Sequence, residues 1–139
     1  MRALIQRVSE DDLRAQVNEY WTVAGVLGHI AFWDGRALAL SDKLDRGLAV
    51  GSQQVFSDYD DEPAEVDWIN DATRPLIHAI PPEELAMLAL DIAEQTDALV
   101  ATLPPEHLWP LDPESPLNPL RASHRGEHLD DIEAALLDR

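Results

Sequence analysis

Cysteine is absent from the 139 residues of this chain. Its absence excludes disulfides, thiolate metal sites, a cysteine nucleophile and dithiol redox chemistry. A metal ion bound by this chain must therefore be held by histidine or carboxylate ligands. The sequence also lacks a glycine-rich phosphate loop and a G-x-S-x-G motif, so it offers no sign of a nucleotide site or of a serine hydrolase.

Basic residues are few. Lysine and arginine number 10 against 27 acidic residues, which gives a formal net charge of −17 at pH 7. A surface with this much negative charge repels phosphate backbones and anionic lipids. Neither nucleic acid nor a membrane surface is therefore expected as a partner. No apolar run approaches the ~18 residues of a membrane span, and the first residues turn acidic before a signal-peptide core can form. The expected location is the cytoplasm.

Strict alternation of apolar and polar residues, which is typical of half-buried strands, occurs almost nowhere in the sequence. Apolar residues recur instead at spacings of three and four, which indicates amphipathic helices. We predict four of them, over residues 22–46, 63–80, 82–103 and about 117–137. They are expected to form one domain over residues 1–139 with an all-α fold, an up-and-down four-helix bundle.

Helix boundaries follow from caps and prolines. A short helical segment is expected to end at Val8, with a new start at Ser9. The pair Pro81–Pro82 must interrupt the helical pattern, because proline lacks the amide hydrogen and clashes with the preceding turn. Residues 51–62 are predicted to form an acidic loop and residues 104–119 a proline-rich connector. The apolar stripe of the helix over 63–80 is expected to include Leu76.

Three histidines stand out as candidate metal ligands. His124 and His128 are four residues apart on the last helix, so their imidazoles leave the same face one turn apart. His29 lies beside the apolar stripe of the helix over 22–46. Neutral imidazole is a common ligand for zinc, nickel and related ions, and three protein ligands leave a coordination position open for catalysis. Glu127 and Asp131 are candidates to move a proton or to orient a ligand histidine.

Plainer interpretations of the same residues stand beside this one. A buried histidine is often a satisfied core residue, and an i, i+4 pair can lie on a solvated helix face. The string from His124 to His128 also fits H-x-x-E-H of the inverted zinc proteases, with Glu127 as general base. That class needs a further ligand on a following helix, and no such helix is predicted. His78 and His107 adjoin proline-rich breaks and are expected at the surface.

Several short motifs resemble the DinB-like (YfiT-like) superfamily. They are Trp21-Thr22-Val23, Leu27-Gly28-His29-Ile30-Ala31-Phe32-Trp33-Asp34, Val66-Asp67-Trp68-Ile69-Asn70 and His124-Arg125-Gly126-Glu127-His128-Leu129-Asp130-Asp131-Ile132. The resemblance implies a four-helix bundle in which one histidine of the second helix and an H-x-x-x-H pair of the last helix bind a divalent ion. In this chain these positions are His29, His124 and His128. The relatives with the most similar motifs are the ClbS/DfsB-like proteins and the N-terminal domains of mycothiol-dependent isomerases.

Three functional hypotheses follow. The first is a metal-dependent enzyme, using zinc or nickel, that activates water or a low-molecular-weight thiol toward a small-molecule substrate; Arg125 would meet a substrate carboxylate. The second is a binding or sequestering module whose cavity holds a small molecule against Trp33, Trp68 and Asn70. The third is a homodimeric bundle whose histidines have lost their role.

Overall fold

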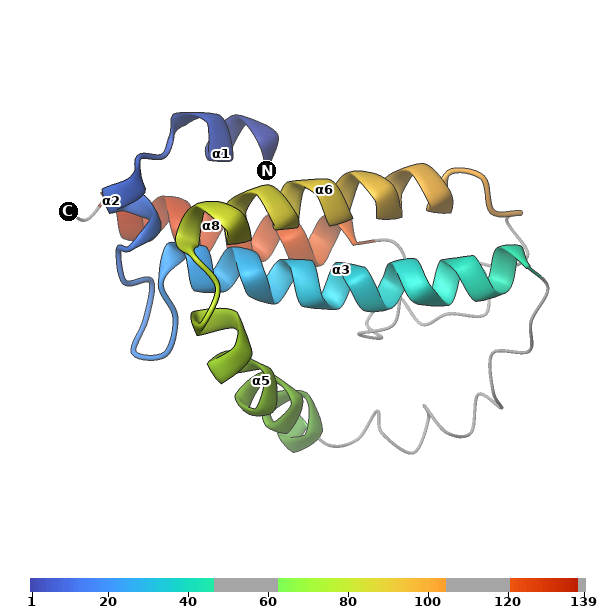
Figure 1. Ribbon diagram of the computed structural model, residues 1–139, viewed down its shortest axis with the longest axis horizontal. Coiled ribbons are helices and arrows are strands. Elements are labelled where there is room, and N and C mark those ends of the chain that lie inside the picture. The colour runs from blue at the N-terminus through green and yellow to red at the C-terminus, as the bar shows by residue number, and fades with distance from the viewer. Residues whose placement is uncertain (47–62, 105–120, 138–139) are drawn as a thin grey trace.

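The computed structural model describes residues 1–46, 63–104 and 121–137 (Figure 1). Within these ranges every regular element is a helix, apart from one isolated β-bridge between Gln16 and Thr22. The predicted all-helical fold class is confirmed. None of the helices seen in these ranges has the length and apolar character needed to cross a membrane.

The chain begins with two short helices, α1 (Arg2–Arg7) and α2 (Glu10–Leu13). The predicted start at Ser9 is confirmed by a capping box. The Ser9 hydroxyl accepts from the Asp12 amide, and the Asp12 carboxylate accepts from the Ser9 amide at 2.9 Å. Ion pairs from Arg2 to Glu94 and from Arg7 to Glu133 connect α1 to the two helices beneath it.

The central helix is α3 (Val23–Asp45), in agreement with the prediction over 22–46. Thr22 caps it, because its hydroxyl accepts from the Gly25 amide at 3.0 Å. Every residue from Val23 to Ala31 is buried, since the other helices cover this half of α3 on several sides. A helix buried all round has no solvent face, so α3 provides the frame on which a site can be built.

Three further helices pack on α3: α5 (Pro63–His78), α6 (Pro82–Val100) and α8 (Ala122–Leu137). The predicted break at Pro81–Pro82 is confirmed, with Pro82 at the first position of α6. The helix predicted over 82–103 ends earlier than expected, at Val100. The predicted start of the last helix near 117, the loop over 51–62 and nearly all of the connector over 104–119 lie outside the described residues.

Contacts along α3 give the directions of its neighbours. A Cβ added at Gly28 would meet Leu85, near the start of α6. Seven residues further along each helix, Gly35 of α3 faces Ile92 of α6, so α6 runs parallel to α3. Trp33 pairs with Asn70 while Gly28 faces Ile77, so α5 runs antiparallel to α3. In Figure 1, α3, α6 and α8 lie along one another and α5 is inclined to them.

The buried face of α5 differs from the predicted stripe by one residue. Leu76 was expected inside, but 70% of it is exposed, whereas Ile77 is 6% exposed and packs beside Gly28. The prediction for Leu76 is wrong. The side chain of Ile77 packs at Gly28, where the missing Cβ of α3 leaves room for it, and this close contact helps to set the rotation of α5.

Candidate metal centre

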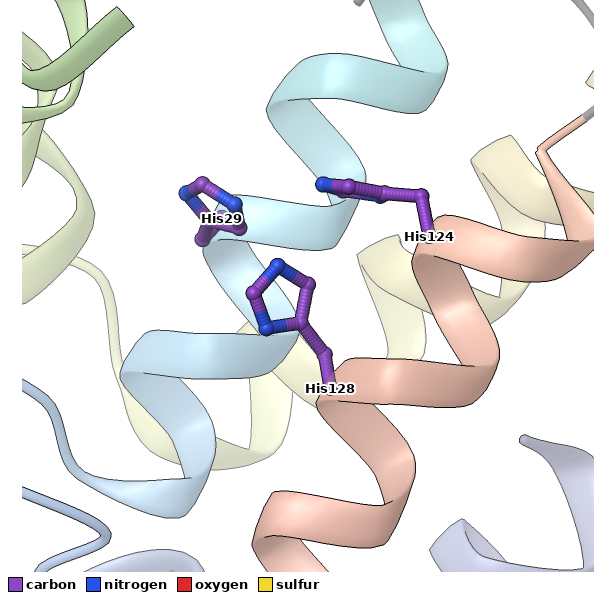
Figure 2. A group of neighbouring side chains, drawn as sticks. All are labelled: His29, His124 and His128. Carbon is purple, nitrogen blue, oxygen red and sulfur yellow. The ribbon is translucent and has the colours of Figure 1, made fainter. Parts of the chain in front are cut away.

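The three predicted ligands converge between α3 and α8. Figure 2 shows the rings of His29, His124 and His128 pointing toward one another, the first from α3 and the other two from successive turns of α8. One ring nitrogen from each lies within 4.8 Å of the nitrogens of the other two. Ring centroids are 4.7 Å apart for His29 and His128 and 4.6 Å apart for His124 and His128. We call these three residues the histidine triad.

The triad has the donor set and nearly the spacing that a divalent ion requires. Tetrahedral zinc with bonds of about 2.1 Å places its ligand nitrogens roughly 3.4 Å apart. The 4.8 Å limit exceeds this by little more than 1 Å, a difference that small rotations of the imidazoles remove. Three imidazoles leave a fourth position for a non-protein group, which is the arrangement of catalytic rather than closed structural sites.

Burial keeps the imidazoles neutral. It lowers the pKa of His29 to about 3, with added repulsion from His128 and Arg121. It lowers the pKa of His124 to about 2, and the guanidinium of Arg121 is the next cause. The pKa of His128 is also lowered by burial, and the carboxylates of Asp131 and Glu127 partly offset that shift. A neutral imidazole has the lone pair that a metal ion needs, so none of the three rings has to lose an added proton before it binds a cation at pH 7.

Arg121 occupies one nitrogen of the triad. Its Nη2 lies 2.6 Å from Nδ1 of His124, and a guanidinium can only donate, so Nδ1 accepts and the ring proton sits on Nε2. An ion on Nδ1 would take the place of Arg121. An ion on Nε2 would move the ring proton to Nδ1, where it repels the donor. Metal binding by His124 therefore requires Arg121 to leave this nitrogen.

A buried ionic network supports the α8 side of the site. Asp34 on α3 is fully buried and accepts from Nε of Arg121 at 3.1 Å and from Nε of Arg125 at 2.6 Å. Nη1 of Arg125 also donates to both carboxylate oxygens of Asp97 on α6, at 2.8 Å to each. A buried carboxylate is tolerated when it is paired in this way. The network joins α3, α6 and α8 next to the triad.

Asp34 and Arg121 were missed as site residues by sequence reasoning. A signal existed for both. Asp34 is a charged residue within the apolar stripe of α3, where an unpaired charge would be costly. Arg121 and Arg125 repeat at the same four-residue spacing as His124 and His128, so two arginines must share a helix face next to the histidines.

The acidic candidates lie at the rim of the site. Both Glu127 and Asp131 are exposed. An Asp131 carboxylate oxygen is 3.8 Å from Nδ1 of His128, which is within ion-pair range but too long for a hydrogen bond. Arg125, predicted to meet a substrate carboxylate, is directed to Asp34 and Asp97 of the protein itself.

Two tryptophan rings flank His29. The ring centroid of Trp21 is 5.8 Å from that of His29, and the centroid of Trp33 is 6.3 Å away on the other side. Trp33 is buried, and its indole N–H donates to Asn70 Oδ1 at 3.0 Å, so two of the three predicted substrate-binding residues bind each other. The third, Trp68, is 74% exposed on α5, and no ring contact joins it to the triad.

The remaining histidines differ from the triad. His78, at the end of α5, is exposed as predicted, with its ring edge-on to Trp21 at 5.5 Å between centroids. His107 lies outside the described residues. Within the parts of the chain that the structure describes, the triad is the group of neighbouring side chains that can hold a metal ion.

Comparison of the chain with protein-family models, with curated proteins and with solved structures found no match. The resemblance to the DinB-like superfamily therefore remains a prediction based on the short motifs. The case for a function comes from the geometry of the triad and its surroundings.

Proposed function

We propose that this chain is a divalent-metal-dependent enzyme of the DinB-like type, with the ion held by His29, His124 and His128. The observation that carries the proposal is the convergence of three neutral imidazoles from two helices, that of His29 buried and those of His124 and His128 partly buried. Core histidines that merely fill space do not need to bring their ring nitrogens together, because unpaired polar atoms in contact gain nothing. A cation bound by all three imidazoles would explain why their ring nitrogens converge.

The directions of the helices support the proposed topology. α3 and α6 run one way, and α5 runs the other way. On α8, Arg125 reaches Asp34 while His128, one turn later, reaches His29, so α8 is antiparallel to α3 as well. This alternation is the up-and-down order expected of a four-helix bundle of the DinB-like type.

The chemistry follows from the open coordination position. A zinc or nickel ion held there would act as a Lewis acid and lower the pKa of water or of a low-molecular-weight thiol. Asp131, 3.8 Å from Nδ1 of His128, would orient that ring by its charge, and Glu127, exposed at the rim, would move a proton to or from a small substrate. Transfer, isomerisation and hydrolysis are all reactions that such an activated nucleophile can carry out.

A binding or sequestering module is the second candidate. The flanking rings of Trp21 and Trp33 favour it, because aromatic walls hold small planar molecules without any metal. The two candidates differ in one measurable property, since only the enzyme needs the ion.

Metal content tests the proposal directly. Elemental analysis of protein purified without a metal-affinity tag is expected to find about one zinc or nickel per chain. A chelator should lower the melting temperature, because an ion that binds only the folded state stabilises it by mass action. His29→Ala and His128→Ala should remove most of that shift.

His78→Ala is the matched control, because His78 is exposed and outside the triad. It should leave the metal-dependent shift intact. An equal response in all three variants, or no effect of metal on the wild-type protein, would contradict the enzyme proposal and leave the binding module.

A further inference from the structure

Arg36 differs from the other arginines of the molecule. Ion pairs with carboxylates are made by Arg2, Arg7, Arg14, Arg46, Arg74, Arg121 and Arg125. Among the residues that the structure describes, Arg36 is the arginine without such a partner. In a chain with 27 acidic residues and 10 basic ones, a lone guanidinium is unexpected on charge balance alone.

Arg36 is also held in place. Its guanidinium carbon lies 4.8 Å from the ring centroid of Trp33, in a cation–π contact. Trp33 is itself buried and is fixed by the hydrogen bond to Asn70. Arg36 is partly buried, and this burial lowers its pKa. A cation that has lost part of its hydration, and that has no carboxylate partner in the described parts of the chain, is costly unless something else supplies the negative charge.

The position of Arg36 relates it to the triad. His29, Trp33 and Arg36 are spaced by four and three residues on α3, so they share one face of the helix. The indole ring of Trp33 contacts the Arg36 guanidinium and lies 6.3 Å from the His29 ring, between centroids. Burial lowers the pKa of the Arg121 guanidinium, the carboxylate of Asp34 opposes that shift, and repulsion from Arg125 and Arg36 adds to it. Arg121 and Arg125 are paired with Asp34, so the positive charge of this region that has no carboxylate partner among the described residues is that of Arg36. A small anion is attracted to such a charge although the molecule as a whole repels it.

We infer that Arg36 is the anchor for an anionic oxygen group, a carboxylate or phosphate, of a small molecule bound at the histidine triad. The guanidinium fork matches either group in a two-pronged contact. Trp33 and Asn70 then serve as positioning residues for Arg36 rather than as substrate contacts. The inference rests on the proposed function for the triad and names the class of its substrate.

The test uses the metal-loaded full chain and a set of defined probes. These are the linear dicarboxylates from succinate to suberate, inorganic phosphate and the neutral glutaramide. Binding is followed by the NMR signal of the Trp33 indole N–H, which is assigned with Trp33→Phe, and by calorimetry. At least one anion should shift this signal, and Arg36→Gln should weaken its binding tenfold or more. The anion that binds more tightly identifies carboxylate or phosphate as the group recognised.

Two matched variants complete the design. Arg46→Gln removes an exposed arginine of the same helix that is already paired with Asp42, and it should bind the anion like the wild-type protein. Arg36→Lys keeps the charge but loses the planar guanidinium, which forms the fork and the stack on Trp33, so this variant should bind the anion with intermediate affinity. It also controls for a folding defect in Arg36→Gln.

The outcomes separate the two proposals. Unchanged anion binding in Arg36→Gln, equal binding of glutaramide, or no anion that shifts the Trp33 signal would overturn the role of Arg36. Metal content, measured in parallel, should be the same in the wild-type protein, Arg36→Gln and Arg46→Gln. Absence of metal from the wild-type protein would overturn the proposed function instead, whatever the anion measurements show.

Discussion

At the scale of single residues, the environment of each histidine decides what it can do. His29 is 8% exposed, and its position among Trp21, Trp33 and the other two histidines of the triad removes most of its hydration. His78 has the same side chain but stands exposed at the end of α5. Burial lowers the pKa of His29 to about 3, so its imidazole stays neutral over most of the acidic range.

This difference predicts a pH dependence of stability for the metal-free protein. The unfolded chain protonates its histidines below about pH 6.5, whereas the pKa of His29 in the folded state is lowered to about 3. The unfolded state therefore binds more protons in this window, and the free energy of unfolding falls as the pH drops. Each such histidine contributes at most about 1.4 kcal/mol per pH unit. Urea unfolding in chelator at pH 7.0, 6.25 and 5.5 measures the slope.

His29→Gln should reduce the slope, because it removes one of the imidazoles that protonate only on unfolding. His78→Gln is the control and should keep the wild-type slope, since that ring is exposed. A slope unaffected by His29→Gln would mean that His29 is protonated to the same extent in both states.

At the scale of helices, α3 is joined to α6 and α8 by one buried residue. The side chain of Asp34 binds Arg121, which directly precedes α8, and Arg125 of α8, its backbone carbonyl accepts from Thr96 of α6, and Arg125 continues to Asp97. Removing one member of a buried ion pair leaves the others desolvated and unpaired.

Asp34→Asn is accordingly expected to destabilise the protein by about 3 to 5 kcal/mol in urea unfolding. Asp42→Asn, in an exposed ion pair with Arg46 on the same helix, should cost less than about 1 kcal/mol. Similar losses in the two variants would show that the buried network contributes no more than a surface pair does.

Two glycines test how closely the helices approach one another. A Cβ at Gly28 would lie 2.6 Å from Cγ2 of Ile77 and 2.8 Å from Cδ2 of Leu85, whereas nothing lies within 4 Å of a Cβ at Gly126. The terminal methyl groups of Leu85 can rotate away from the added Cβ. Cγ2 of Ile77 is attached directly to the Cβ of that residue and has little freedom to move. Three helices thus meet at Gly28, and Gly126 faces open space.

Gly28→Ala should therefore lower the free energy of unfolding by about 1 to 3 kcal/mol through overpacking. Gly126→Ala should raise it by roughly 0.5 to 1 kcal/mol, because alanine favours the helix. The second variant lies between His124 and His128 and should keep the metal-dependent shift in melting temperature. A stabilising Gly28→Ala would contradict the close contact of α3 with α5 and α6.

At the scale of the whole molecule, charge is the dominant feature. A net charge of −17 makes the compact state repel itself. The ion pairs of Arg2, Arg7, Arg14 and Arg46 are all exposed and weak. Moderate sodium chloride screens the repulsion more than it weakens these pairs. The melting temperature of the metal-free protein should therefore rise by a few degrees between low salt and 0.15 M sodium chloride, as measured by circular dichroism; a fall would contradict this balance.

Local features of the chain were sufficient to predict the helices. The spacing of apolar residues predicted α3 almost to its ends, the capping residues at Ser9 predicted the start of α2, and Pro81–Pro82 predicted the break before α6. The face shared by His124 and His128 was equally predictable. Each of these rests on interactions between residues a few positions apart, which act in the same way whatever the rest of the fold does.

Only the tertiary structure decided how the helices face one another and which side chains meet. The rotation of α5 depends on the space above Gly28, so Ile77 rather than Leu76 is buried. Asp34 meets arginines 87 and 91 residues away, and the same contacts leave Arg36 as the guanidinium without a carboxylate in the described parts of the chain. Helical periodicity gives the direction of each side chain around the axis of its own helix. The rotation of one helix against another is set by packing and charge pairing between distant segments, which no local pattern contains.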